Sequence, residues 1–299
     1  MTTGEAVFHR LQQLARVQRT ETGQLAATSE FLTRHCLESF LDRLTRTQHG
    51  RDFILKGGIL LAVYGVRRAT KDVDAEAVSA NVTAAHLKQV VHDIAAISID
   101  DGVAFDMDSI TVHQIREAAD YPGLRVKVRA SVGASPITVT WDVSAGDPVV
   151  PAPRLVSVPR VLGEPIQMLG YAPETTVAEK GVTILERGTT STRWRDYIDI
   201  VRLAEDHGLN PDLLLEAAQA VARYRGVTLT PITSVIAGYG AIGQAKWAAW
   251  RRKEKMEHLS EPDLDAQMAR VAAILDPVFS AGPADDIDDS RNPHPDIRG

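Results

Sequence analysis

The segment KGGILLAVYGVRRATKDVD, residues 56–74, is the most informative part of this 299-residue chain. A short apolar run at residues 51–55 leads into its Gly-Gly pair and is typical of a strand. Residues 59–64 predict a brief helix that ends at Gly65, because glycine readily adopts the left-handed backbone of a helix end. Residues 72–78, DVDAEAV, alternate in character and predict a second strand. The expected local order is strand, tight turn, helix and strand.

Two carboxylates occupy alternate positions on the second predicted strand. Side chains on a strand alternate between its faces, so Asp72 and Asp74 point to one face and Val73 points to the core. Such a pair is unfavourable unless a cation occupies it, and Mg²⁺ held by carboxylates and phosphate oxygens is the usual occupant. A bare Asp-x-Asp is more often a solvated strand end, so the pair needs a second feature beside it.

The Gly-Gly turn is that second feature. Gly57 and Gly58 allow close approach to the backbone, and the helix that follows them presents unpaired N–H groups and a positive dipole end to an anion. One short segment therefore predicts both a phosphate cradle and a metal site. This combination is much less common than an isolated Asp-x-Asp.

The rest of the chain divides into a mixed N-terminal half and a helical C-terminal half. Helical spacing predicts two helices across residues 4–46 and another from an N-cap at Asn81 to residue 94. Strands are expected at residues 104–105, 110–115, 124–132 and 137–143. The proline-containing segment 148–159 interrupts every periodic pattern and is typical of a boundary. Helices are expected beyond it at residues 176–187, 196–206, 212–225, 244–255 and 261–274.

Composition narrows the class of protein. A 44% apolar content can bury a substantial core, and a net charge of −6 argues against a uniformly basic nucleic-acid binder, though not against a local basic cleft. The single cysteine, Cys36, excludes an internal disulfide and favours a reducing compartment, so a cytoplasmic protein is expected. Neither an export signal nor a membrane span is predicted. Residues 281–299 are predicted to be a disordered acidic tail, because they hold too few apolar residues to offset the entropy of ordering.

The Gly-Gly turn followed by Asp-apolar-Asp resembles the signature of the DNA polymerase β-like nucleotidyltransferase superfamily. More narrowly, KGG…YG…RRATKDVD is similar to the AbiEii-type nucleotidyltransferase toxins, including the MenT group. The resemblance implies an α/β (α+β) fold, with a polymerase β-like core built on a mixed or antiparallel sheet and a helical C-terminal domain. The expected division is a nucleotidyltransferase core with N-terminal helices at residues 1–160, and a mainly helical domain at residues 161–280 that completes the active-site cleft.

The superfamily resemblance also implies a third carboxylate on a neighbouring antiparallel strand. Asp142, in TVTWDV, matches this position and would join Asp72 and Asp74 as a catalytic residue and a ligand to Mg²⁺. The alternative is that Asp142 ends its strand and caps the turn at residues 144–147. The residues alone support the two interpretations equally.

A second match to the AbiEii-type pattern lies at residues 175–199. It consists of the helical run AEK at residues 178–180, an arginine two turns later at Arg187, and an Arg-Asp pair at residues 195–196 that opens the next helix. The family pattern places Lys180 on the nucleotide phosphates and Asp196 in the catalytic pocket.

A structural role for this second match is the alternative. Considered alone, Lys180 would pair with Asp196 or Asp199 on a surface and have no part in the chemistry. The chain also departs from the family at Gly181 and Thr183, where larger apolar and alanine residues are expected.

Together the two matches imply a Mg²⁺-dependent enzyme that uses an NTP. An acceptor hydroxyl would attack the α-phosphate in line, and pyrophosphate would leave. By resemblance the acceptor is the 3′ end of tRNA, so that translation stops, and a cognate antitoxin is the implied partner. The residues themselves leave open a protein or small-molecule acceptor, transfer of the γ-phosphate, and a non-catalytic nucleotide-binding module. The nucleotide-binding residues implied by both matches are Lys56, Gly57, Gly58, Arg68, Thr70, Lys180 and Arg187.

Three further patterns carry weaker signals. The run GYGAIG at residues 238–243 matches a dinucleotide-binding glycine motif but has no strand before it, so a loop between packed helices is expected. The basic run at residues 251–255, beside two tryptophans, fits an RNA-contacting surface or a solvated helix end. Alternate positions put Arg125, Lys127 and Arg129 on one strand face, where they line a cleft for phosphates or solvate an exposed sheet. No histidine or cysteine spacing indicates zinc.

Overall fold

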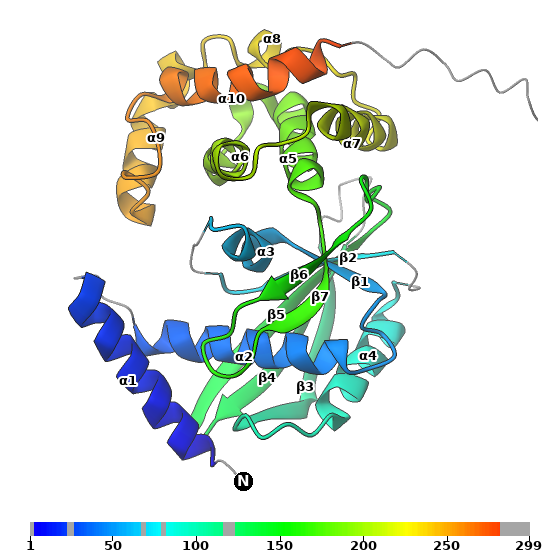
Figure 1. Cartoon of the computed structure of the whole chain (residues 1–299), viewed down its shortest axis with the longest axis vertical. Coiled ribbons are helices and arrows are strands. Elements are labelled where there is room, and N and C mark those ends of the chain that lie inside the picture. The colour runs from blue at the N-terminus through cyan, green and yellow to red at the C-terminus, as the bar shows by residue number, and fades with distance from the viewer. Residues whose placement is uncertain (1–2, 23–26, 67–69, 79–81, 116–122, 282–299) are drawn as a thin grey trace, which may run out of the picture. The chain divides into compact units, whose positions relative to one another are not determined.

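The structure is a computed structural model that describes residues 3–22, 27–66, 70–78, 82–115 and 123–281 (Figure 1). These residues form ten α-helices and a seven-stranded mixed sheet, which confirms the predicted mixed α/β class. The chain divides into two compact units, one of residues 1–177 and 202–209 and one of residues 178–201 and 210–299. Of the helices in the described ranges, none has the length and apolar character needed to cross a membrane.

The first unit holds the sheet and the helices packed on it. Its two N-terminal helices, α1 (Gly4–Thr22) and α2 (Thr28–Thr45), confirm the prediction for residues 4–46. The elements that follow are β1 (Phe53–Lys56), α3 (Gly57–Val63), β2 (Val73–Ala77), α4 (Ala84–Ala96), β3 (Val103–Ile115), β4 (Gly123–Val132), β5 (Ser135–Ala145), β6 (Arg154–Val158) and β7 (Ile166–Gly170). The predicted order of strand, helix and strand is present as β1, α3 and β2.

The strand order in the sheet is β3-β4-β5-β2-β1-β7-β6. β2 lies between β5, to which it is parallel, and β1, to which it is antiparallel. The register of β2 with β5 sets Val73 beside Trp141 and Asp74 beside Asp142. Residues that are far apart in the sequence therefore share one row across the sheet.

Apolar side chains on one face of the sheet form the core of the first unit. Trp141 is buried there and packs against Phe53 of β1 and Phe40 of α2, with ring centroids 4.7 Å and 5.5 Å apart. Alternate residues of β5 point to the opposite face and stay polar, as the pleat of a strand requires. Asp142 belongs to this polar face because its neighbour Trp141 belongs to the core.

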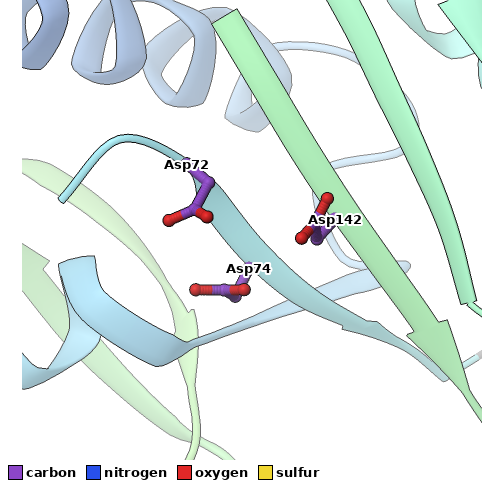
Figure 2. A group of neighbouring side chains, drawn as sticks. All are labelled: Asp72, Asp74 and Asp142. Carbon is purple, nitrogen blue, oxygen red and sulfur yellow. The ribbon is translucent and has the colours of Figure 1, made fainter. Parts of the chain in front are cut away.

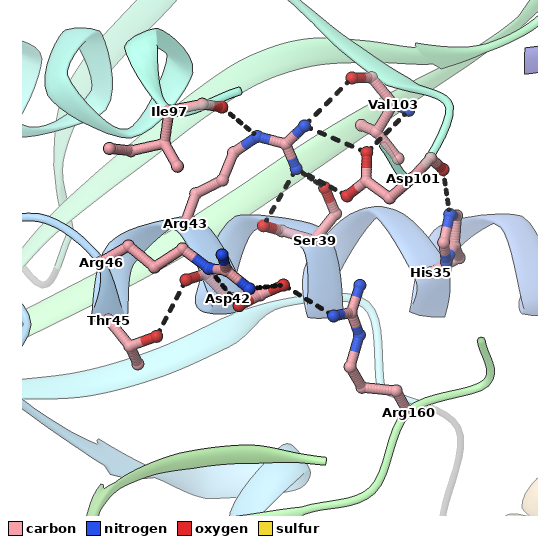
Figure 3. Close-up of polar contacts among 10 residues, drawn as sticks. All are labelled: His35, Ser39, Asp42, Arg43, Thr45, Arg46, Ile97, Asp101, Val103 and Arg160. Atoms are coloured by element: carbon pink, nitrogen blue, oxygen red, sulfur yellow. Dashed lines mark hydrogen bonds and ion pairs between the residues drawn. The ribbon is translucent and has the colours of Figure 1, made fainter. Parts of the chain in front are cut away.

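A buried polar network ties α2 to the segment that links α4 and β3 (Figure 3). The Arg43 guanidinium donates to both carboxylate oxygens of Asp101, at 2.7 Å and 3.0 Å, and also to three backbone carbonyls. Near it, Asp42 accepts hydrogen bonds from Arg46 and Arg160. Because Arg43 and Asp101 are almost completely buried, each compensates a charge that would be costly alone.

In the first unit, the structure differs from three local predictions. Residues 104–105 and 110–115 form one strand, β3, whose register with β4 shifts between Asp106 and Thr111. The N-cap of α4 is Thr83, whose hydroxyl accepts from the His86 backbone N–H, and not Asn81, which lies outside the described residues. The segment 148–159 contains β6, which pairs with β7, so the sheet continues past residue 160. Its prolines flank β6, and β6 is an edge strand, where proline is tolerated.

Helices make up most of the described residues from 173 to 281, as predicted. α5 (Pro173–Arg187) and α6 (Trp194–His207) contribute residues to both units, and the second unit also contains α7 (Pro211–Tyr224), α8 (Thr233–Ile236), α9 (Tyr239–Glu254) and α10 (Leu264–Phe279). The loop expected at residues 238–243 is instead the start of α9. Gly240 allows α9 to approach Asp265, whose carboxylate accepts from the Gly240 N–H at 2.8 Å. The predicted tail lies, apart from residue 281, outside the described residues.

Candidate active site

Three carboxylates converge at the edge where β2 begins (Figure 2). Asp72 directly precedes β2, Asp74 is its second residue, and Asp142 lies opposite Asp74 on β5. One carboxylate oxygen from each residue lies within 4.8 Å of the other two. The carboxylate triad, meaning Asp72, Asp74 and Asp142, is therefore a geometric unit made by two neighbouring strands.

The neighbouring strand is parallel to β2, whereas the resemblance implied an antiparallel one. The difference does not separate the carboxylates, because the register pairs Asp74 with Asp142 directly. Asp142 lies inside β5, which runs to Ala145, and its carboxylate is bound by Arg125. The arrangement agrees with the triad interpretation of Asp142 and not with a strand-end cap of the turn.

The surroundings of Asp74 raise its pKa. Burial, followed by the nearby Asp72 and Asp142 carboxylates, raises its pKa to about 6, while the Gly58 N–H and Lys56 oppose this shift. The Gly58 N–H donates to Asp74 Oδ2 at 3.4 Å. The carboxylates gathered around Asp74 are the electrostatic setting that a bound metal ion would relieve.

Gly57 allows the backbone to pass next to Asp74. It has a φ of 66°, in the left-handed region, and a Cβ placed on it would lie 1.9 Å from Asp74 Oδ2. Only glycine satisfies both requirements, because it has no Cβ and adopts positive φ without strain. The predicted close approach at the Gly-Gly pair is therefore present, and the group that approaches is a triad carboxylate.

Arg125 of β4 is paired with Asp142. Its guanidinium donates two hydrogen bonds to the Asp142 carboxylate, with Nε–Oδ1 and Nη2–Oδ2 distances of 2.7 Å and 2.6 Å. A bidentate pair of this kind fixes the plane of a carboxylate. Arg125 thus orients one triad member from the neighbouring strand.

Glu76 is a buried carboxylate beside the triad that the sequence interpretation missed. It is fully buried, and its pKa is raised by that burial and lowered by Lys56, whose Nζ donates to Glu76 Oε2 at 2.8 Å. The Ser144 hydroxyl donates to the same oxygen at 2.6 Å. These contacts join β1, β2 and β5 next to the triad. The sequence does carry a signal for Glu76, because Asp72, Asp74 and Glu76 occupy alternate positions of one strand segment.

The other nucleotide-binding predictions in the first unit fall close to the triad or outside the described residues. The Thr70 hydroxyl donates to the backbone carbonyl and to Oδ1 of Asp72, both at 3.2 Å. Lys56 is engaged with Glu76, as described above. Arg68 lies outside the described residues.

The second predicted motif forms a cluster within the second unit. Lys180 Nζ contacts a carboxylate oxygen of Asp196 and lies 2.9 Å from Asp199 Oδ2, and Arg193 also binds Asp196. Burial alone would raise the pKa of Asp196, but Lys180 and Arg193 lower it to about 2. The Lys180 pairing foreseen as the structural alternative is present, but the side chains are buried and do not lie on a surface.

The remaining residues of this motif explain the departures from the family pattern. A Cβ on Gly181 would lie 2.7 Å from the Phe279 ring. A residue larger than glycine at this position of α5 would therefore clash with α10. The Thr183 hydroxyl donates to the Glu179 carbonyl and accepts from Arg225. Arg187 is exposed at the last residue of α5.

The donor set of the triad fits a hard divalent cation. Carboxylate oxygens are the protein ligands that Mg²⁺ and Ca²⁺ prefer, and three from two rigid strands leave room for further oxygen ligands from a substrate. The ion itself is not identified by these residues. The arrangement provides a negatively charged, preorganised site at the beginning of β2, next to the backbone of Gly57 and Gly58.

Comparison with known proteins gives a family. The profile of the family described as "Nucleotidyl transferase AbiEii toxin, Type IV TA system" matches residues 39–288. Among solved structures, JHP933 from Helicobacter pylori is 16% identical with a TM-score of 0.48, over 86% of this chain and 94% of that one. A candidate nucleotidyltransferase from H. pylori is 15% identical with a TM-score of 0.48, over 84% and 95%. No curated protein sequence matches. Because the family profile covers most of the chain, the protein belongs to the AbiEii family of nucleotidyltransferase toxins of type IV toxin–antitoxin systems.

Proposed function

We propose that this nucleotidyltransferase transfers nucleotides from an NTP to the 3′ end of tRNA in a Mg²⁺-dependent reaction and so blocks translation. The observation that carries the proposal is the carboxylate triad, in which one oxygen atom from each residue lies within 4.8 Å of the other two, beside the Gly57 backbone. The resemblance to the MenT group supports tRNA as the acceptor. The family description supports a cognate antitoxin as the functional partner.

Asp72, Asp74 and Asp142 are the residues that would hold Mg²⁺. When bound, the ion supplies charge neutralisation for the phosphate oxygens and for the attacking and leaving oxygens. The role of the protein is to present the three carboxylates without rearrangement, because preorganised charge costs nothing at the moment of reaction. Arg125 maintains the orientation of Asp142, and the Gly58 N–H maintains that of Asp74.

The transfer exchanges one phosphorus–oxygen bond for another. The acceptor hydroxyl oxygen bonds to the α-phosphorus, the bond from that phosphorus to the bridging oxygen breaks, and pyrophosphate leaves with the bonding electrons. Asp142 receives the proton of the acceptor hydroxyl in this proposal, since it is the triad member contributed by β5 and not by the β2 segment. Proximity and orientation account for most of the rate enhancement in such a displacement.

The nucleotide is proposed to bind through residues of both motifs. Lys180 and Arg187 would contact the triphosphate, and Asp196 would orient Lys180 as a member of the catalytic machinery. The family profile includes both motifs, which supports treating them as parts of one function. The remaining members of the proposed nucleotide-binding set are Lys56, Gly57, Gly58, Arg68 and Thr70.

The test is a labelling experiment with the purified full-length chain. The protein is incubated with Mg²⁺, total tRNA and each α-³²P-labelled NTP in turn, beside Asp74→Asn and a matched control, Asp108→Asn. Asp108 is an exposed carboxylate on β3 and is not a triad member. We expect label on tRNA with at least one NTP, unchanged in Asp108→Asn and lost in Asp74→Asn.

Two results would overturn parts of the proposal separately. A tRNA pool that stays unlabelled with all four NTPs excludes tRNA as the acceptor and favours a protein or small-molecule hydroxyl. Labelling that persists after EDTA treatment excludes dependence on a divalent metal ion, because EDTA removes the ion without altering the carboxylates.

A further inference from the structure

A row of polar side chains runs across the sheet from the carboxylate triad to its edge. The strand registers align Asp74 of β2 with Asp142 of β5, Asp142 with Arg125 of β4, and Arg125 with His113 of β3. The triad is therefore continuous, on the same face, with the surface of the three outer strands. On this face, β5, β4 and β3 lie at increasing distance from β2 and the proposed reaction centre.

The outer part of this face carries a line of cations. Arg125, Lys127 and Arg129, which we name the basic strip, occupy alternate positions of β4, so their side chains share one face about 7 Å apart. Lys127 and Arg129 are exposed, and Arg125 is partly exposed. Val126 and Val128, at the intervening positions, are buried in the core. The cations are thus held in a regular array by the strand and not by loops.

The side chains around the basic strip are polar. Lys127 is flanked in register by Thr111 and Thr140, and Arg129 by Asp106 and Thr138. The Arg129–Asp106 pair, at 2.8 Å, is largely exposed and therefore weak, so another anion can displace Asp106. Among the described residues, Lys127 has no ion-pair partner. The protein as a whole carries a charge of −6, so this cationic line differs from the average surface.

From this arrangement we infer that the basic strip binds the sugar–phosphate backbone of a polynucleotide acceptor whose terminal hydroxyl lies at the triad. The inference rests on the proposed function, in that the acceptor is an RNA. A polynucleotide that reaches Asp142 with its end must lay its following phosphates over the neighbouring surface. Exposed cations and hydroxyls in line are the groups that bind phosphates and 2′-hydroxyls.

The composition of the face also indicates how the RNA is recognised. At the exposed positions of β3, β4 and β5 within the described ranges, His113 is the only ring, and no Phe, Tyr or Trp is present for base stacking. Proteins that read bases on a sheet surface use such aromatic side chains. The basic strip therefore contributes affinity that depends on salt and not on the base sequence, and discrimination between tRNAs is made elsewhere.

The test compares two double variants of the full-length chain. Lys127→Gln with Arg129→Gln removes two cations of the basic strip and leaves Arg125, and hence Asp142, unchanged. The control, Arg10→Gln with Lys88→Gln, removes the same charge from exposed positions on α1 and α4. The probe is a 5′-fluorescein-labelled tRNA pool, its affinity is measured by fluorescence anisotropy between 50 and 300 mM KCl, and thermal unfolding confirms that all proteins are folded.

We expect the basic-strip variant to bind tRNA about tenfold more weakly than the wild type, with the slope of log K against log [KCl] reduced by about 1 to 2. The control variant should retain both values. If the basic-strip variant and the control variant have equal affinity and slope while the wild type still labels tRNA, the inference about the basic strip is refuted and the proposed function is not. A wild type that neither binds nor labels tRNA would refute the proposed function as well. Unchanged tRNA binding with loss of binding to an acidic protein partner would assign the basic strip to that partner instead.

Discussion

Substitution of Gly57 by alanine tests whether catalysis requires the close approach of the Gly57 backbone to the Asp74 carboxylate. Gly57 has a φ of 66°, and a Cβ there would lie 1.9 Å from Asp74 Oδ2, whereas real Cβ contacts are essentially never shorter than 3.0 Å. The Asp74 carboxylate or the Gly57 backbone must therefore move by about 1 Å, because the contact has to lengthen at least that far. Either movement shifts Asp74 relative to Asp72 and Asp142.

The size of the effect follows from two contributions. A side chain in the left-handed backbone region costs about 1–2 kcal/mol of stability wherever it occurs. A displacement of about 1 Å at a reacting centre costs about a hundredfold in rate, which corresponds to about 2.7 kcal/mol in activation free energy. Gly57→Ala is thus expected to lose stability modestly and nucleotidyl transfer severely.

Gly65→Ala is the matched control for this prediction. Gly65 has a φ of 79° at the end of α3, but a Cβ added to it would have no other atom within 4 Å, so only the backbone cost applies there. We expect both variants to lower the urea unfolding midpoint, Gly57→Ala by at least as much as Gly65→Ala, and only Gly57→Ala to reduce kcat/KM for nucleotide transfer about a hundredfold. If the two variants retain equal activity, the proximity of Gly57 to Asp74 has no part in catalysis and the reasoning fails.

Three further predictions concern the ion pairs. Arg125→Ala should lower kcat about tenfold with little change in thermal stability, because a partly exposed pair contributes little to folding; steady-state kinetics that match the wild type would contradict a positioning role for Arg125. Asp101→Ala should reduce the free energy of unfolding by about 3–5 kcal/mol in urea titrations, since it leaves the buried Arg43 guanidinium unpaired, and a loss below about 1 kcal/mol would show that the network is dispensable. The folded-state pKa of Asp196, about 2, lies below its usual value of 3.8, so its ionisation stabilises the fold by about 2 kcal/mol above pH 4, and this contribution is lost as the pH falls toward 2. Urea titrations of Asp196→Asn and the wild type should therefore differ most at pH 5–7 and converge toward pH 2, whereas a difference independent of pH would exclude the carboxylate charge as the cause.

Local features of the site were predictable because they depend on neighbours within a few residues. The alternation of Asp72, Val73 and Asp74 placed two carboxylates on one strand face, and β2 has this arrangement. The Gly-Gly pair predicted a close backbone approach, and Gly57 makes one. The predictions that failed, such as the loop at residues 238–243, treated glycine as a breaker where the helix needed a small residue facing Asp265.

The sequence alone therefore determined the strand, turn and helix at residues 51–78, the orientation of Asp72 and Asp74, and the helical character of the C-terminal half. Only the tertiary structure decided that Asp142 and Arg125 align with Asp74 in one row, that Glu76 and Lys56 join three strands beside the triad, and that Lys180 is buried with two aspartates. The physical reason is that strand neighbours and register follow from long-range packing, here Val73 beside Trp141 in the core, which backbone periodicity does not encode.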